Sequence, residues 1–199
     1  MTTNKRDPEG LIIVISGPSG VGKGTICKRL LEADQNLALA VSATTREQSH
    51  TEVDGKDYHF LSEETFQAMI DKDGFLEWAE VHGHRYGTMR DKVLEVVRSG
   101  KDCLLEIDVQ GGHQIAQSMK ESCATIFIKP PSEEELIKRI TNRKRDNDDI
   151  KRRMMTARWE MTQEENYQYS VVNDILDEAV DEVLRIIKEV RESHASAID

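Results

Sequence analysis

Hydrophobic residues along the chain form two alternating kinds of segment, short unbroken apolar runs and longer amphipathic stretches. The stretches predict helices: Ile26, Leu30 and Ala33 recur at helical spacing, and residues 175–192 form an amphipathic pattern. The runs predict strands that are buried on both faces. They are LIIVIS (11–16), CLLEIDV (103–109), ATIFIK (124–129) and YSVVN (169–173). Alternating strands and helices predict an α/β fold, with a parallel sheet covered by helices on both faces.

Two segments interrupt this alternation. Residues 44–90 contain most of the aromatic side chains, with turn signals at Asp54-Gly55 and Asp73-Gly74, and residues 138–160 form a basic helical stretch. Neither fits a strand–helix unit of a parallel sheet. We expect both to project from a single-domain core, where substrates would bind.

Charge is distributed unevenly along the chain. The 199 residues carry a formal net charge of -10, which argues against nucleic acid as the main partner. Residues 138–153 nevertheless contain eight Lys or Arg and three Asp, so this segment is +5 and the rest of the chain is -15. A basic segment on an acidic protein indicates a small anionic ligand.

The three cysteines, Cys27, Cys103 and Cys123, have no metal-binding or redox spacing. We expect them to be buried free thiols in a reducing compartment. No apolar run approaches the length of a membrane span, and the first ten residues are polar. The sequence therefore predicts a cytoplasmic protein without a membrane partner. We expect it to be a monomer or a weak homo-oligomer.

A glycine-rich segment, GPSGVGKGT, follows the first predicted strand and opens the first predicted helix. Gly17, Gly22 and Lys23 fit the phosphate-binding pattern of Gly, four residues, Gly and Lys. Backbone N–H groups and the positive end of the helix can surround a phosphate, and the lysine reaches the β- and γ-phosphates. The predicted nucleotide-binding residues of this loop are Gly17, Pro18, Ser19, Gly20, Val21, Gly22, Lys23, Gly24 and Thr25.

The position that normally supplies a magnesium-binding hydroxyl is Gly24, and the hydroxyl comes one residue later, at Thr25. Mg²⁺ dehydrates reluctantly and keeps several waters, so direct ligation by the loop is not essential. We expect the phosphates of the bound nucleotide to hold the metal, without an all-protein metal site. Thr25, Glu106 and Asp108 are candidates for outer contacts to the metal or for substrate contacts.

From about Leu11 to Glu192 the chain resembles guanylate kinases. Several short motifs follow the family order and are specific in combination: Thr44-Thr45-Arg46, Glu52-Val53-Asp54-Gly55, Asp57-Tyr58, Phe60, Leu76-Glu77, Tyr86-Gly87-Thr88 and Asp108-Val109-Gln110-Gly111. The resemblance implies a P-loop NTPase-type parallel sheet sandwiched by helices. It also implies a GMP-binding arm at 44–90, a mobile lid at 138–160, and a core that comprises residues 10–43, 91–137 and 161–192.

The resemblance implies roles for individual residues. The GMP phosphate would be bound by Arg46, Tyr58 and Tyr86. The guanine base would be read by four polar side chains, those of Ser42, Glu77, Thr88 and Asp108. Three lid arginines would close over ATP and the transferred phosphoryl group: Arg139, Arg143 and Arg153. The expected catalytic residues are Lys23, Arg46, Arg143 and Arg153.

The chemistry of guanine supports one of these roles independently. Guanine presents N1–H and a 2-amino group side by side, and these two donors suit one carboxylate, that of Glu77. AMP would put a lone pair against that carboxylate, and an unpaired buried group of this kind discriminates roughly 10⁴ to 10⁵-fold. Phosphoryl transfer itself requires two nucleotides to be held together and the negative charge to be neutralised. Lys23, Mg²⁺ and the basic lid would supply that charge.

One position departs from the family pattern. The family has a second arginine on the GMP phosphate three residues after the first, and this chain has Ser49 there. Either GMP is bound more weakly, or a nearby cation compensates, for which Arg85 beside Tyr86 is the first candidate and His50 a poorer one. No histidine is assigned a role, and His84 is expected on a loop surface. Phe66, Trp78 and Trp159 are expected in the core.

We interpret the chain as a guanylate kinase that moves the γ-phosphoryl group of ATP to GMP with Mg²⁺. Two alternatives remain. One is a guanylate-kinase-like module that binds phosphorylated peptides without catalysis, and the other is a kinase of another small phosphate acceptor. The intact Lys23 loop and the lid arginines argue against the binding module, whereas Ser49 favours it.

Overall fold

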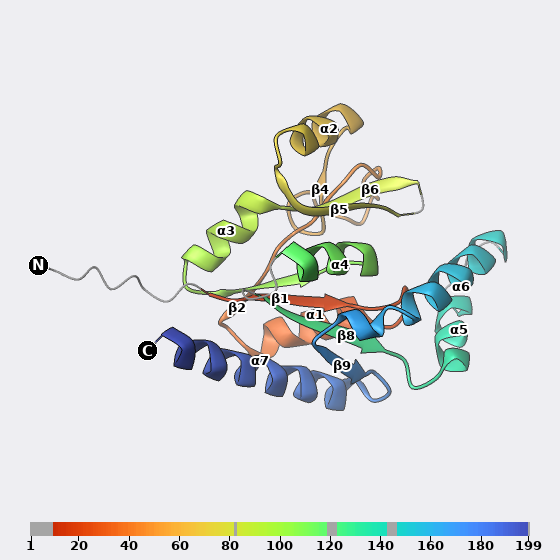
Figure 1. The fold of residues 1–199 in the computed structure, drawn as a ribbon. Coiled ribbons are helices and arrows are strands. Elements are labelled where there is room, and N and C mark those ends of the chain that lie inside the picture. Colours follow the sequence, from red (N-terminus) through yellow and green to blue (C-terminus); the bar gives the residue numbers. More distant parts are fainter. Residues whose placement is uncertain (1–9, 82, 119–122, 143–146, 199) are drawn as a thin grey trace, which may run out of the picture.

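The computed structural model describes residues 10–81, 83–118, 123–142 and 147–198, and the strands of these residues form two sheets (Figure 1). The larger sheet is parallel throughout. Its strands follow the order β2 (Leu37–Leu39), β7 (Asp102–Glu106), β1 (Ile12–Ser16), β8 (Cys123–Lys129) and β9 (Tyr169–Val172). This arrangement confirms the predicted α/β class.

Four strands of the larger sheet, β1, β7, β8 and β9, are those predicted from the apolar runs. β2 was not predicted, because three residues are too short for a periodic signal. The second apolar run was expected to continue as a strand to Val109, and this was wrong, since β7 ends at Glu106 and Val109 begins a helix.

Helices cover both faces of the larger sheet (Figure 1). Along β1, Ile13 and Ile15 face one apolar cluster while Ile12 and Val14 face another, and each is at most 4% exposed. This alternation follows from the two-residue period of a strand. The helices on the Ile13 face are α1 (Lys23–Ala33) and α7 (Leu176–Ile198), and those on the Ile12 face are α3 (Arg90–Arg98) and α4 (Val109–Ser118).

The smaller sheet lies over α4 and was not predicted as a sheet (Figure 1). Its strands follow the order β4 (His59–Phe60), β3 (Ala43–Thr44), β6 (His84–Met89) and β5 (Phe75–Val81). Above it lies α2 (Glu63–Asp71), whose Phe66 stacks on Phe75 with ring centroids 4.4 Å apart. Phe66 is fully buried, as expected, so the smaller sheet has a core of its own.

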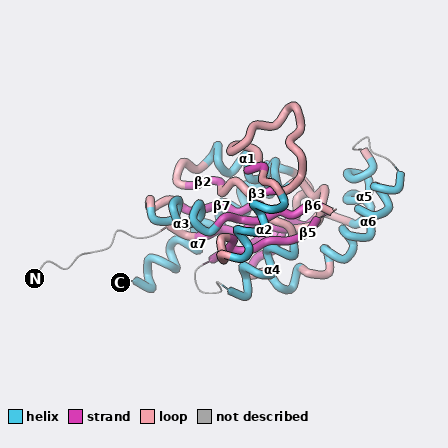
Figure 2. The backbone as a smooth tube through the Cα atoms, turned by 90° about the horizontal axis from the view of Figure 1, so that it is seen from above, coloured by secondary structure: helices cyan, strands magenta, loops and turns pink. Residues whose placement is uncertain are grey.

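The helices α5 (Glu133–Thr141) and α6 (Asn147–Met161) lie together at one end of the molecule (Figure 2). Arg158 Nε is 2.6 Å from Glu133 Oε1, an ion pair that joins the two helices. A short 3₁₀ helix, η1 (Glu164–Asn166), leads from α6 to β9. The expectation that Trp78 and Trp159 are core residues was wrong, because they are 39% and 49% exposed.

The three cysteines are buried and free, as expected. Burial raises the pKa of Cys123 to about 11 and that of Cys103 to about 12, so these thiols are unreactive near neutral pH. Within the described part of the chain, none of the helices combines the length and the apolar character needed to cross a bilayer.

Candidate active site

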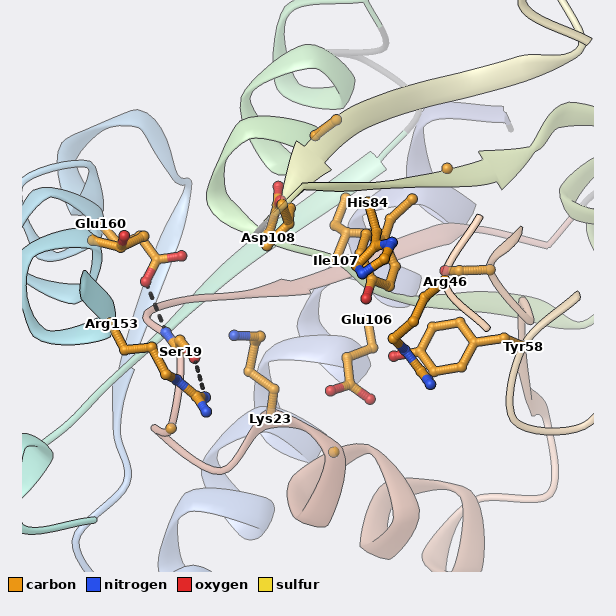
Figure 3. A pocket seen from close by; sticks show the side chains of 18 of the residues that line it. Ser19, Lys23, Arg46, Tyr58, His84, Glu106, Ile107, Asp108, Arg153 and Glu160 are labelled. Atoms are coloured by element: carbon orange, nitrogen blue, oxygen red, sulfur yellow. Dashed lines mark hydrogen bonds between the residues drawn. The ribbon is translucent and has the colours of Figure 1, made fainter. Parts of the chain in front are cut away.

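A cleft of about 930 Å³ lies between the carboxyl ends of β1 and β7, the smaller sheet and α6 (Figure 3). In open α/β sheets the carboxyl ends of the strands are where ligands usually bind. Most of the predicted site residues line this cleft: Ser19, Gly20, Gly22, Lys23, Gly24, Thr25, Ser42, Arg46, Tyr58, Glu77, Tyr86, Asp108 and Arg153. Segments that are far apart in the sequence therefore meet at one cavity.

The loop between β1 and α1 has the geometry of an anion site. Gly17 has φ 140°, and a Cβ there would lie 2.1 Å from the backbone oxygen of Ile128, so only glycine fits. The first turn of α1 holds no acidic residue, which leaves the positive end of the helix available to an anion. Lys23 Nζ donates to the Gly17 carbonyl at 2.6 Å. Pro18 and Val21 complete the loop without lining the cleft.

Beside Gly24, the carboxylate of Glu106 takes the space that a larger side chain would need. A Cβ at Gly24 would lie 3.3 Å from Glu106 Oε1. Burial raises the pKa of Glu106, and the nearby ammonium of Lys23 partly offsets this effect. The loop has no hydroxyl at position 24, but the carboxylate of Glu106 from the end of β7 lies beside this position. Both residues line the cleft.

Three residues expected to bind phosphate form one cluster on the smaller sheet. The Arg46 guanidinium lies 5.5 Å from the Tyr58 ring, and the Tyr58 and Tyr86 rings meet edge to face at 5.8 Å. Arg46 is held by a bidentate pair with Glu52, at 2.7 Å and 3.0 Å. This pair raises the pKa of Arg46 and lowers that of Glu52, so both groups are charged. A preoriented guanidinium in a cluster with two phenols suits a phosphate.

The carboxylate of Glu77 is buried and held in place on two sides. Glu77 is 5% exposed, and Thr88 Oγ1 donates to Glu77 Oε1 at 2.5 Å from behind the cleft wall. On the other side, a Cβ at Gly111 in α4 would lie 2.2 Å from Glu77 Oε2. Asp108 Oδ1 accepts from the Gly111 N–H at 2.8 Å. Burial raises the pKa of Glu77 to about 7, so this carboxyl titrates near neutral pH.

Of the three arginines that were expected in the lid, those that the structure describes do not lie together. Arg153 is 6% exposed, lines the cleft, and donates from Nη2 to Ser19 Oγ at 2.8 Å (Figure 3). Arg139 lies outside the main cleft, in a neighbouring pocket of about 420 Å³ on the other side of the loop, and its Nη1 donates to the Asn173 carbonyl at 2.9 Å. Arg143 lies outside the described residues.

The sequence analysis missed several residues that line the cleft, among them Glu160 and His84. Glu160 is 6% exposed, and its Oε2 accepts from the Ser19 N–H at 2.8 Å (Figure 3). A carboxylate from α6 therefore already binds one backbone amide of the loop. Its spacing could have been noticed, because Arg152, Thr156 and Glu160 are four residues apart and share one helix face. The second is His84, which lies on β6 and lines the cleft; the expectation of a loop surface was wrong.

Arg85 points away from the cleft. Its Nη1 donates to Gln67 Oε1 at 2.8 Å and its Nε is 3.5 Å from Glu63 Oε2, both on α2. Its guanidinium also lies 6.0 Å from the Trp78 ring. The geometry therefore does not support Arg85 as the cation that compensates for Ser49.

Comparison with known proteins agrees with this site. The family model for guanylate kinase matches residues 9–190. The guanylate kinase of Caldanaerobacter subterraneus subsp. tengcongensis is 48% identical over 180 residues, which cover 90% of this chain and 87% of that protein. The guanylate kinase of Anaeromyxobacter dehalogenans is 43% identical over 192 residues, 96% of this chain and 85% of that protein.

A solved structure gives the same result in three dimensions. The crystal structure of guanylate kinase from Anaplasma phagocytophilum superposes with a TM-score of 0.76 at 35% identity, and the match covers 92% of this chain and 87% of that one. Sequence, fold and cleft geometry thus agree along nearly the whole chain. The chain belongs to the guanylate kinase family.

Proposed function

We propose that the chain is an ATP:GMP phosphotransferase, which moves the γ-phosphoryl group of ATP to GMP and gives ADP and GDP. One observation carries this function: the P-loop lysine at the start of α1 and the buried carboxylate of Glu77 on β5 line the same cleft. A donor nucleotide on the loop and an acceptor on the smaller sheet would therefore bring their phosphates together. Holding two reactants in this way supplies much of the catalysis of phosphoryl transfer.

GMP would bind along the smaller sheet. The Glu77 carboxylate would accept from guanine N1–H and the 2-amino group, with Ser42, Thr88 and Asp108 beside it. Arg46, Tyr58 and Tyr86 would hold the phosphate, and their clustering within 5.8 Å supports this role. The arm would comprise residues 44–90.

ATP would bind at the loop between β1 and α1. Loop amides and Lys23 would hold its phosphates, and the pocket beside Arg139 is where its base end would lie. Arg153, already bonded to Ser19, would neutralise charge on the transferred group, as would Arg143. Residues 138–160 would act as a lid over a core of residues 10–43, 91–137 and 161–192. As the phosphates enter, the Lys23 ammonium would exchange the Gly17 carbonyl for phosphate oxygens.

Mg²⁺ is proposed as the metal that accompanies ATP. Among the described residues there is no group of three or more His, Cys, Asp or Glu side chains arranged for a metal, so phosphates and water would supply most ligands. Glu106 fits such a shared site, because its oxygens lie beside Gly24 at the start of α1. Thr25 and Asp108 would support the hydrated ion. When bound, the metal would neutralise charge between the β- and γ-phosphates.

The free, buried cysteines support a reducing, cytoplasmic location, where both nucleotides are also available. The proposed partners are small molecules alone, and the proposed state is a monomer or a weak homo-oligomer.

Coupled measurement of ADP release over GMP, AMP, CMP and UMP tests the function. We expect turnover with GMP at least 10³-fold above AMP in kcat/KM, since an unpaired buried carboxylate rejects adenine strongly. Release with another monophosphate but not GMP would indicate a different acceptor. No release with any of them, together with binding of a phosphoserine peptide, would identify a non-catalytic binding module.

A further inference from the structure

The first residue of β6, His84, presents its imidazole to the acceptor side of the cleft. Its side chain lines the cavity and lies near Arg46 (Figure 3). Tyr86, two residues on, lines the same cavity, as the alternation of a strand requires. Arg85 between them is bound to α2 instead. His84 is therefore on the phosphate-binding face of β6, and Arg85 is on the other.

The chain that follows β3 brings Arg46 to the side of the cleft where His84 lies. β3 and β6 are antiparallel, with Thr44, the last residue of β3, opposite Tyr86. Beyond this ladder the Thr45 N–H donates to the Arg85 carbonyl at 3.0 Å and the Arg85 N–H donates to Thr45 Oγ1 at 3.0 Å, so the backbone stays beside β6 for one more residue. Arg46 follows in a bend, and its side chain lines the same cleft as that of His84 (Figure 3). An anion bound by Arg46 would therefore lie on the same side of the cleft as the imidazole.

Arg46 and His84 differ in the hydrogen bonds that they already make within the protein. The Arg46 guanidinium is paired with Glu52 on one edge. The His84 ring has no hydrogen bond or ion pair with any other residue in the described part of the chain. A histidine ring carries an N–H donor in both its neutral and its charged form. The ring is thus a donor at the cavity wall that finds no acceptor among the residues that the structure describes, and it shares this wall with the Arg46 guanidinium.

We propose that His84 is a further substrate-binding residue, which donates a hydrogen bond to the phosphate of the acceptor nucleotide. This inference rests on the proposed function, because it needs a nucleoside monophosphate on the smaller sheet. His84 adds a donor to the wall of the cleft that Arg46 also lines. It contributes to affinity for the phosphate and not to recognition of the base.

The test compares ligands with and without the phosphate. Isothermal titration with GMP and with guanosine would be measured for the wild type, for His84→Ala and for the neighbouring Arg85→Ala, which faces α2. In His84→Ala we expect the Kd for GMP to rise about tenfold, the effect of losing one hydrogen bond to a charged group. The Kd for guanosine and the KM for ATP should not change. Arg85→Ala should bind both ligands as the wild type does.

A second variant separates the hydrogen bond from the packing of the ring. His84→Gln keeps an N–H donor and should recover most of the GMP affinity, whereas His84→Phe keeps the ring and should not. Equal losses of GMP and guanosine affinity in His84→Ala, or no loss of either, would overturn the proposal. A wild type that does not bind GMP would refute the proposed function itself. A wild type that phosphorylates GMP, with an unaffected His84→Ala, would refute only the histidine contact.

Discussion

Lowering the pH should weaken GMP binding through Glu77. Burial raises the pKa of this carboxyl to about 7, with the neighbouring Asp108 acting in the same direction and the Thr88 hydroxyl opposing it. Guanine offers two donors, so it binds the ionised carboxylate. The neutral form, which predominates below the raised pKa, carries a proton where the base must donate. Affinity is therefore full above about pH 7 and is lost as the pH falls through that value.

The magnitude follows from the ionised fraction. With a pKa of about 7, roughly nine tenths of the carboxyl is ionised at pH 8 and roughly one tenth at pH 6. The apparent affinity scales with the competent fraction, so the KM for GMP should rise about tenfold between these values, a change of about 1.4 kcal/mol. The phosphate of GMP, with a second pKa near 6, adds about twofold in the same direction.

Steady-state kinetics at saturating ATP from pH 6 to 8 would measure this effect, with Glu77→Gln as the control. The amide does not titrate, so only the twofold phosphate effect should remain in the variant. At pH 8 the variant should also raise the KM for GMP more than tenfold, because a charge-assisted hydrogen bond is worth about 1.5–3 kcal/mol. A flat profile in the wild type would refute the reasoning, and an unchanged tenfold rise in the variant would assign it to another group.

Three further substitutions test other parts of the site. Lys23→Ala should abolish detectable GDP formation with an unchanged circular dichroism spectrum, and near-normal turnover would contradict the proposed role of the loop. Ser49→Arg should lower the KM for GMP roughly tenfold and leave that for ATP unchanged, since a guanidinium adds two charge-assisted bonds; an unchanged KM for GMP would mean that the phosphate needs no second arginine. Gly111→Ala would put a Cβ 2.2 Å from Glu77 Oε2, so it should raise the KM for GMP but not for ATP, and equal rises in both would indicate a general disturbance of the fold.

The central strands of the larger sheet, β1, β7 and β8, could be predicted because they are buried on both faces and are therefore unbroken apolar runs in the sequence. The edge strand β9 was also predicted from an apolar run, although only one of its four residues is buried. The smaller sheet could not be predicted in the same way. Its strands β3 and β4 are two residues long and exist only by pairing with distant segments. Such pairing leaves no periodic signal, so residues 44–90 showed only turns and aromatic residues.

The residues of the candidate site likewise fall into those that sequence motifs identify and those that depend on tertiary structure. Lys23, Arg46, Glu77 and the other motif residues could be named from the sequence, since each belongs to a short ordered pattern. His84 could not, because its place at the cleft depends on how β6 pairs with β5. Glu160 was missed for a similar reason, since it reaches the loop only when α6 packs beside Ser19. Residues that reach the cleft only through tertiary packing therefore could not be identified from sequence motifs.

The position of the Glu77 carboxylate depends on α4 as much as on the smaller sheet. In the smaller sheet β5 is an edge strand, and its exposed edge is bonded by a side chain of α4: Gln114 Nε2 donates to the Trp78 carbonyl at 2.9 Å, and Trp78 N donates to Gln114 Oε1 at 3.4 Å. Gly111 is three residues before Gln114 and so lies on the same face of α4, where it admits the Glu77 carboxylate. One face of α4 therefore both hydrogen-bonds β5 and leaves the space into which the Glu77 side chain packs. We therefore expect changes in the packing of α4 against β5 to alter selectivity for guanine. The cluster of Arg46, Tyr58 and Tyr86 lies toward the other side of the same sheet.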